Sequence, residues 1–264
     1  METRKIEVPV MAECFAKGEK PEYLFWVGCA GAFDDRYKKV VRAFTRILTY
    51  LGVNFAVLGK EETCNGDPAR RAGNEMLYQM QALQLIEIFR MYEVKKIITI
   101  CPHCYNIFKN EYPDLGGNYE VINYLQFLNR KIENGELKIA PGSLNNISIT
   151  YHDPCYLARA NDIYNEPRNI LKKLTGNLVE MDRNKSFALC CGAGGAQMFK
   201  EAEKGSKEVF LERTEDALKT GARVIATACP FCMTMLTDGL KYKNKEEEIR
   251  NLDIAELIAH SIDL

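Results

Sequence analysis

The chain has 264 residues, 47% of them hydrophobic and 27% charged, which is ordinary for a globular protein of one or two domains. Its formal net charge of -1 does not favour nucleic-acid binding, and no apolar run approaches the roughly 20 residues that span a bilayer. The residues from Met1 to Val8 lack the apolar core of a signal peptide. We therefore expect a cytoplasmic protein that reaches a membrane only peripherally, through partners.

Predicted strands and helices alternate along the chain. In the first half, the hydrophobic pattern predicts strands at 23–27, 55–58, 97–100 and 121–122, and helices at 39–51, 75–92 and 124–132. In the second half it predicts strands at 147–151, 178–180 and 224–227, and helices at 168–174, 209–219 and 254–262. Alternation of this kind is typical of an α/β fold with parallel sheets.

A segment rich in glycine, proline and asparagine, residues 134–146, separates the halves and is predicted to be a linker. The expected architecture is two tandem Rossmann-like lobes, each with a small parallel sheet. The first lobe is residues 1–140 and the second lobe is residues 141–264.

Cysteine spacing indicates that the second lobe is a duplicate of the first. Among ten cysteines, four pairs recur at an offset of 126 or 128 residues: Cys29 and Cys155, Cys64 and Cys190, Cys101 and Cys229, and Cys104 and Cys232. A nearly constant offset favours an internal repeat. In a reducing cytosol, clustered cysteines favour metal binding over disulfides.

Four of these cysteines follow predicted strands. Cys29, Cys101, Cys155 and Cys229 each lie just beyond the C-terminal end of a strand, and the Cys101-Pro-His-Cys104 segment is expected to be a turn. In open parallel sheets that edge forms the ligand crevice. We therefore expect a metal centre at the C-terminal edge of each sheet.

The second lobe offers five thiols, including the adjacent pair Cys190 and Cys191. A structural zinc ion takes four ligands, so a fifth thiol would be surplus. In addition, two cysteines adjacent in the sequence do not readily ligate the same ion. The set therefore favours a multinuclear iron–sulfur cluster. Gly192 and Gly194 would let the backbone approach this cofactor. A dinucleotide loop is the alternative for these glycines, but Gln197 replaces the last glycine of that fingerprint.

The second half reads Cys-x34-Cys-Cys-Gly-x36-Cys-Pro-x-Cys, and the first half repeats most of it. This tandem arrangement resembles the cysteine-rich "CCG" domain family. That family includes the B-type and D-type polypeptides of heterodisulfide reductase and the iron–sulfur subunits of glycerol-3-phosphate, lactate and glycolate oxidation systems. Phe25-Trp-Val-Gly-Cys-Ala-Gly31 and Glu62-Thr-Cys-Asn-Gly-Asp67 resemble a narrower, heterodisulfide-reductase-like group linked to electron-transfer flavoprotein or quinone.

The resemblance implies a non-cubane [4Fe-4S] cluster in the second lobe, held by five cysteines: Cys155, Cys190, Cys191, Cys229 and Cys232. In the first lobe Asn65 replaces one cysteine of the pair. Only Cys29, Cys64, Cys101 and Cys104 remain, and these suit a cubane [4Fe-4S] cluster or a zinc ion.

The function implied is that of an iron–sulfur electron-transfer subunit of an oxidoreductase complex. Its partners would be a ferredoxin-domain protein, a flavoprotein or a dehydrogenase subunit, and its acceptor a quinone or disulfide. One alternative is a catalytic disulfide reductase that binds substrate at the second-lobe cluster, with no catalytic residue assigned. Another is a zinc-stabilised interaction module without redox activity.

Two histidines lie within the cysteine motifs. His152 precedes Cys155 and is expected either to donate a proton or hydrogen bond near the second-lobe centre, or simply to shape the turn. His103 lies between Cys101 and Cys104, where the second lobe has Phe231, so the fold does not require an imidazole there.

Overall fold

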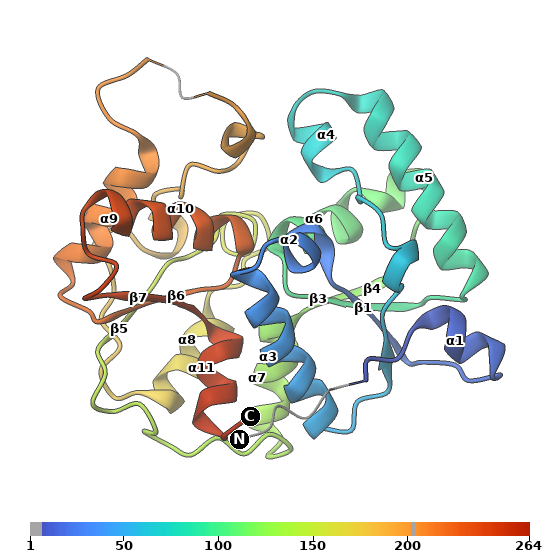
Figure 1. The fold of residues 1–264 in the computed structure, drawn as a ribbon, viewed down its shortest axis with the longest axis horizontal. Helices are drawn as coiled ribbons and strands as arrows, with labels where there is room; N and C mark the ends of the chain where they lie inside the picture. The colour runs from blue at the N-terminus through green and yellow to red at the C-terminus, as the bar shows by residue number, and fades with distance from the viewer. Residues whose placement is uncertain (1–6, 202–203) are drawn as a thin grey trace.

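The computed structural model describes residues 7–201 and 204–264 (Figure 1). The sequence has no signal-peptide core between Met1 and Val8. Of these residues, Met1 to Ile6 lie outside the range that the structure describes. Two parallel sheets form the centre of the molecule. The first has the order β2-β1-β3-β4, and the second has the order β5-β6-β7. Their strands are β1 Tyr23–Trp26, β2 Phe55–Ala56, β3 Lys96–Thr99, β4 Glu120–Asn123, β5 Ile149–Tyr151, β6 Val224–Thr227 and β7 Arg250–Asp253.

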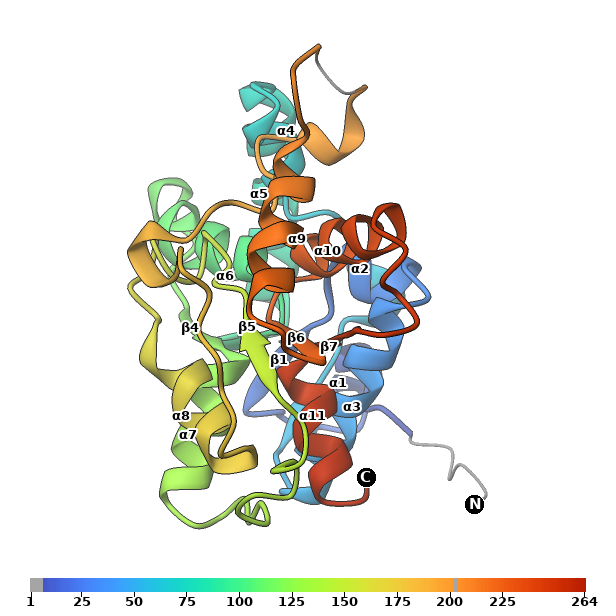
Figure 2. The same ribbon diagram turned by 90° about the vertical axis from the view of Figure 1, so that its left-hand side faces the viewer.

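Helices cover both faces of each sheet, as the two views in Figures 1 and 2 show. The first lobe contains α1 Met11–Ala16, α2 Gly28–Phe33, α3 Tyr37–Tyr50, α4 Asp67–Arg71, α5 Glu75–Met91, α6 Pro102–Asn110 and α7 Tyr124–Glu133. The second lobe contains α8 Asn165–Leu174, α9 Val209–Lys219, α10 Pro230–Tyr242 and α11 Ile254–Ser261. The predicted α/β fold with two parallel sheets is confirmed.

The two sheets share one topology. In the first sheet, β2 lies at the edge beside β1. In the second sheet, Leu178 takes the equivalent place beside β5, where it forms a single parallel bridge with Ile149. The strand predicted at 178–180 is therefore wrong in extent, since only one residue pairs. Strand β7 was not predicted, because Arg250, Asn251 and Asp253 are polar. These pairings support the duplication inferred from the cysteine offsets.

The Cys101-Pro-His-Cys104 segment is not the turn that was expected. Cys101 is the N-cap of α6, and Cys229 is the N-cap of α10 in the second lobe. In both cases proline follows, and its fixed φ angle favours the first position of a helix. The last cysteine of each motif therefore lies in the first helical turn, one turn along from the N-cap.

The lobes share one hydrophobic core. Helices α3 and α7 of the first lobe pack against α11 and α8 of the second, below the sheets in Figure 1. Phe44 and Ile258, from opposite lobes, are both fully buried in this core. Leu137 and Leu144, from the predicted linker, are buried in it as well. The segment that joins the sheets is thus part of the core.

A buried polar cluster crosses the same interface. Asp253 caps α11 and accepts a hydrogen bond from the Tyr124 hydroxyl of the first lobe at 2.8 Å. The neighbouring Glu256 binds the Arg36 guanidinium, also of the first lobe, at 2.7 Å. Burial raises the pKa of Asp253 to about 8, although the Ala255 N–H and the Tyr124 hydroxyl oppose this rise.

This shift predicts a pH-dependent stability. Between pH 4 and 8 the folded protein holds a proton on Asp253 that the unfolded chain has released, so the free energy of unfolding should fall as pH rises. The expected contribution is roughly 1 kcal/mol per pH unit. Asp253→Asn keeps the N-cap of α11 but has no carboxyl group to titrate, so the free energy of unfolding should depend less steeply on pH. Urea unfolding of both proteins at pH 5, 6 and 7 measures it, and equal slopes would mean that Asp253 is ionised in the fold.

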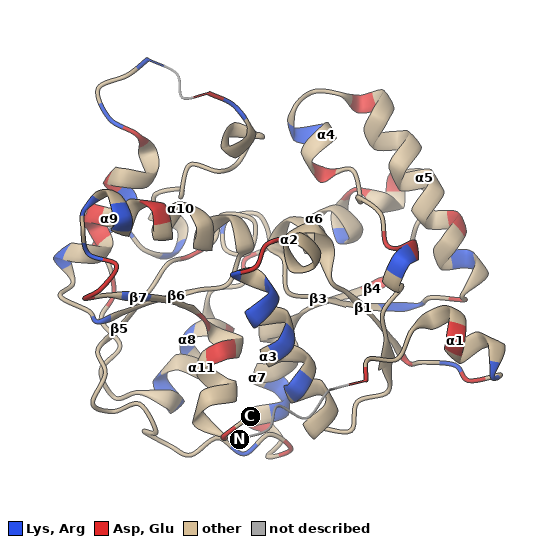
Figure 3. Cartoon of the chain, viewed as in Figure 1, with Lys and Arg blue, Asp and Glu red and all other residues tan. Residues whose placement is uncertain are grey.

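Acidic and basic residues are interspersed over both lobes (Figure 3). None of the helices within residues 7–201 and 204–264 has both the length and the apolar character needed to cross a membrane.

Candidate functional site

The five second-lobe cysteines come together from three segments of the chain. Cys155 follows β5, Cys190 and Cys191 precede α9, and Cys229 and Cys232 begin α10 after β6. Side-chain hydrogen bonds connect the sulfurs in series, from Cys155 to Cys190, to Cys191, to Cys232 and to Cys229. Cys191, Cys229 and Cys232 are buried. The fold thus gathers these cysteines above the C-terminal ends of β5 and β6.

Contact between the thiols spreads their pKa values apart. Hydrogen bonds from Cys155 and Cys191 lower the pKa of Cys190. Burial opposes ionisation of Cys229, but hydrogen bonds from Cys232 and from a first-lobe histidine outweigh it and lower the pKa to about 5. The pKa values of Cys155, Cys191 and Cys232 are raised, first by the hydrogen bonds to neighbouring sulfurs. Thiols this close can all ionise together only around a positively charged centre.

His152 lies against this group of sulfurs. One of its ring nitrogens lies within 4.8 Å of the Cys191 and Cys232 sulfurs. The Arg213 Nε donates to His152 Nδ1 at 2.9 Å, and both side chains are fully buried. Burial, followed by the Arg213 charge, lowers the pKa of His152 well below its usual value. The imidazole is therefore neutral, with its proton on Nε2.

The Nε2–H of His152 is thus available to a sulfur. Among the residues that the structure describes, this buried nitrogen has no hydrogen-bond partner. The contacts favour the hydrogen-bonding interpretation of His152 over simple shaping of the turn. Arg213, which fixes the tautomer, was missed in the sequence, where a lone arginine within a helix carries no signal for such a contact.

A buried ion pair holds two of the cysteine loops together. The Arg168 guanidinium binds both carboxylate oxygens of Asp153 at 2.8 and 2.9 Å and both oxygens of Glu180 at 2.7 and 2.9 Å. Asp153 also accepts the backbone N–H of Lys185 at 2.8 Å. Because Asp153 precedes Cys155 and Lys185 precedes Cys190, this carboxylate connects the loops that carry both cysteines.

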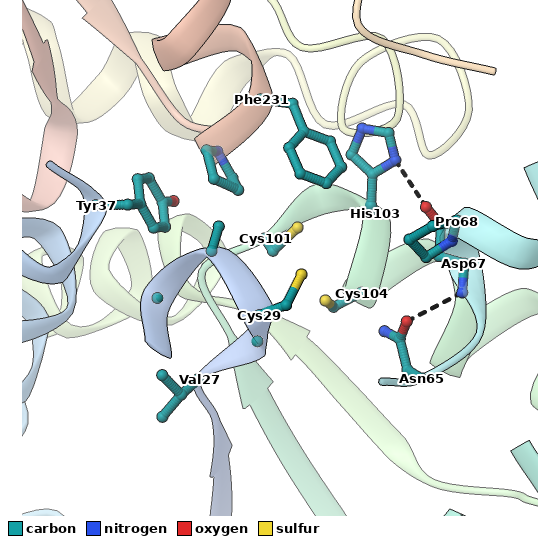
Figure 4. Close-up of a pocket in the computed structure, with 14 residues that line it drawn as sticks. Val27, Cys29, Tyr37, Asn65, Asp67, Pro68, Cys101, His103, Cys104 and Phe231 are labelled. Atoms are coloured by element: carbon teal, nitrogen blue, oxygen red, sulfur yellow. Dashed lines mark hydrogen bonds and ion pairs between the residues drawn. The ribbon is translucent and has the colours of Figure 1, made fainter. Parts of the chain in front are cut away.

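The first-lobe cysteines occupy equivalent places. Cys29 lies in α2 after β1, Cys64 precedes α4, and Cys101 and Cys104 begin α6 after β3. Cys29, Cys101 and Cys104 line a pocket together with Asn65 (Figure 4). Cys64 does not line this pocket. Burial, followed by the nearby Cys101 and Cys64 sulfurs, raises the pKa of the Cys29 thiol to about 11.

The Cys-x-Gly backbone is the same in both lobes. The Gly66 N–H donates to the Cys64 sulfur at 3.4 Å, and the Gly192 N–H donates to the Cys190 sulfur at 3.3 Å. Both glycines are left-handed, with φ of 89° and 91°. A Cβ at Gly66 would meet the Tyr78 ring at 2.7 Å. Gly194 lines a second pocket, between the lobes.

Two unpartnered N–H donors lie at the first-lobe cysteines. Within residues 7–201 and 204–264, the buried Asn65 Nδ2 and Trp26 Nε1 have no acceptor. Figure 4 shows the Asn65 amide beside Cys104, with its oxygen bound to the Asp67 N–H. A Cβ built on Gly28 would lie 3.7 Å from Trp26 Nε1 and 3.5 Å from the Cys104 sulfur. Buried donors without a partner suit a sulfur-rich group, because sulfide and thiolate accept hydrogen bonds.

The two cysteine sets meet at the interface between the lobes. Pro230 and Phe231 of α10 line the first-lobe pocket with Cys101. The His103 ring packs on Phe231, with centroids 4.7 Å apart, although these residues occupy equivalent positions in the repeat. The hydrogen bonds of His103 reach Asp67 and Cys229.

A family model described as "Cysteine-rich domain" matches the chain twice, over residues 23–109 and 149–237. The chain belongs to this cysteine-rich (CCG) domain family. The matched segments begin at β1 and β5 and contain all nine clustered cysteines, with one set in each segment. The resemblance to this family is therefore confirmed.

Three relatives of this CCG protein are named as oxidoreductases or as part of one. It is 45% identical to the probable iron-sulfur-binding oxidoreductase FadF of Bacillus subtilis, over 97% of this chain and 36% of that protein. It is 46% identical to the EtfAB:quinone oxidoreductase of Syntrophomonas wolfei, over 91% of this chain and 34% of that protein. It is 34% identical to one subunit of the dihydromethanophenazine:CoB–CoM heterodisulfide reductase of Methanosarcina barkeri, over 93% of this chain and 60% of that protein. The chain thus spans about a third of the first two relatives.

Proposed function

We propose that this chain is an iron–sulfur electron-transfer unit of an oxidoreductase complex. In this proposal Cys155, Cys190, Cys191, Cys229 and Cys232 ligate a non-cubane [4Fe-4S] cluster. The observation that carries the proposal is the unbroken series of contacts among these five sulfurs, which includes an adjacent pair. One tetrahedral zinc ion would leave a thiol unused.

For the first lobe we propose a cubane [4Fe-4S] cluster bound by Cys29, Cys64, Cys101 and Cys104. A zinc ion is the other occupant that four thiolates suit. The unpartnered donors Asn65 Nδ2 and Trp26 Nε1, noted above for the described part of the chain, support the cluster. A cluster adds inorganic sulfides to the four thiolates and so offers more acceptors to these two N–H groups.

The residues of the chain would hold and tune these groups. The thiolates bind iron, the Gly66 and Gly192 N–H groups donate to ligand sulfur, and the buried surroundings exclude water. Hydrogen bonds and burial both set the reduction potential of an iron–sulfur group. When bound, such a group supplies one-electron transfer.

We propose that the partners are a ferredoxin-type domain or subunit and a flavoprotein or dehydrogenase, and that the acceptor is a quinone or disulfide. The names of the relatives, which include an EtfAB:quinone oxidoreductase, support this choice. Attachment to a membrane would be peripheral, through these partners.

The primary test is metal analysis of protein purified without oxygen. Iron with an equal amount of acid-labile sulfide is expected, at roughly eight irons per chain for two four-iron clusters. About four irons with one zinc would assign zinc to the first lobe. Zinc alone, in place of iron, would make the chain a zinc-stabilised module and overturn the proposal.

A second candidate, direct disulfide reduction at the second lobe, is favoured by the relative named as part of a heterodisulfide reductase. Reduced protein mixed with a heterodisulfide separates the two. A substrate-dependent EPR signal that is lost in Cys191→Ser would favour catalysis. Oxidation by a quinone-linked partner, without any response to the disulfide, would favour the relay.

A further inference from the structure

His103 contacts both candidate centres from the interface between the lobes. It lies in the first turn of α6, only 6% exposed, between Tyr156 and Phe231 of the second lobe, at ring distances of 4.5 and 4.7 Å. Its Nδ1 lies 3.1 Å from the Asp67 carboxylate (Figure 4), and its side chain hydrogen-bonds the Cys229 sulfur of the second lobe. A first-lobe imidazole thus reaches a proposed second-lobe ligand.

The two partners fix where the ring protons lie. Asp67 is held as a carboxylate by the Arg71 guanidinium, which donates to its other oxygen at 3.1 Å. Cys229, as a ligand, would be a thiolate without a proton. Carboxylate and thiolate only accept hydrogen bonds, so both ring nitrogens of His103 must donate. The geometry describes a donor that spans the two lobes.

The repeat makes this contact one-sided. The residue equivalent to His103 is Phe231, which packs on His103 but carries no donor. Cys101, the equivalent of Cys229, therefore receives no such hydrogen bond from position 231. At this pair of equivalent positions, the interface between two similar lobes thus delivers an N–H to the second-lobe set and none to the first-lobe set.

We propose that His103 is a positioning residue that acts across the lobe interface and raises the reduction potential of the second-lobe centre by donating to Cys229. A hydrogen bond to a ligand sulfur stabilises the more negative, reduced state of an iron–sulfur group. The inference rests on the proposed function, because it requires iron at the second lobe.

The test replaces His103 with the residue that the second lobe has at this position. His103→Phe should keep the iron content but move the midpoint potential of the second-lobe EPR signal to more negative values. A tenfold fall in the equilibrium constant for reduction is expected, which is about 59 mV for a one-electron couple. Tyr156→Phe, which keeps the ring against His103, is the matched control and should not shift the potential.

His103→Gln retains one side-chain N–H and should give a smaller negative shift. If the phenylalanine variant fails to fold, the glutamine variant decides, since a negative shift supports the proposal. Iron-loaded variants with the wild-type potential would overturn it. A wild-type protein without iron would instead refute the proposed function, so the two failures are distinguishable.

Discussion

Replacing Cys191 with asparagine is expected to abolish the distinctive EPR signature of the second-lobe centre while leaving the first-lobe signal in place. The substitution copies the first lobe, where Asn65 follows Cys64. The amide of asparagine donates hydrogen bonds but supplies no thiolate, so only four cysteines would remain in the second lobe. EPR spectra of the reduced and oxidised protein, with iron analysis, measure the change.

The matched control is Cys14→Ser, which removes the one cysteine that lies outside both sets. It should leave both EPR signals and the iron content unchanged. If Cys191→Asn also leaves both signals unchanged, Cys191 does not ligate the cluster, and the five-cysteine site is wrong.

Arg168→Leu is expected to destabilise the second lobe by about 3–5 kcal/mol, the range found when one partner of a buried ion pair is removed. The side chain of Asp153 is fully buried and would lose its bidentate counter-charge. Glu180 is 35% exposed and can turn to solvent, so Asp153 accounts for most of the cost. Because Asp153 also binds the Lys185 N–H, the loops carrying Cys155 and Cys190 should separate and iron should be lost.

Urea unfolding and iron analysis measure this effect. Lys172→Leu, on an exposed position of the same helix, should change the free energy of unfolding by no more than about 0.5 kcal/mol. An Arg168→Leu protein that keeps its stability and its iron would show that the ion pair does not hold the cysteine loops.

The sequence alone determined the duplication, the α/β class and the difference between the cysteine sets. The offsets of 126 and 128 residues and the alternation of strands and helices are properties of the linear order. A strand such as Val224–Thr227 is predictable because its apolar run reflects its own burial. The single bridge at Leu178 and the polar strand β7 were not predictable in this way, because their pairing depends on neighbouring strands.

Only the tertiary structure decided how the cysteine sets are supported. Arg213 lies 61 residues from His152 and Arg168 lies 15 residues from Asp153, so neither pairing leaves a periodic pattern in the sequence. The shared core of α3, α7, α8 and α11 brings the lobes together, and with them His103 and Cys229. The spacing of the cysteines in the sequence shows which residues occupy equivalent positions in the two lobes. Contacts between distant residues arise only when packing of the apolar core fixes how the lobes meet.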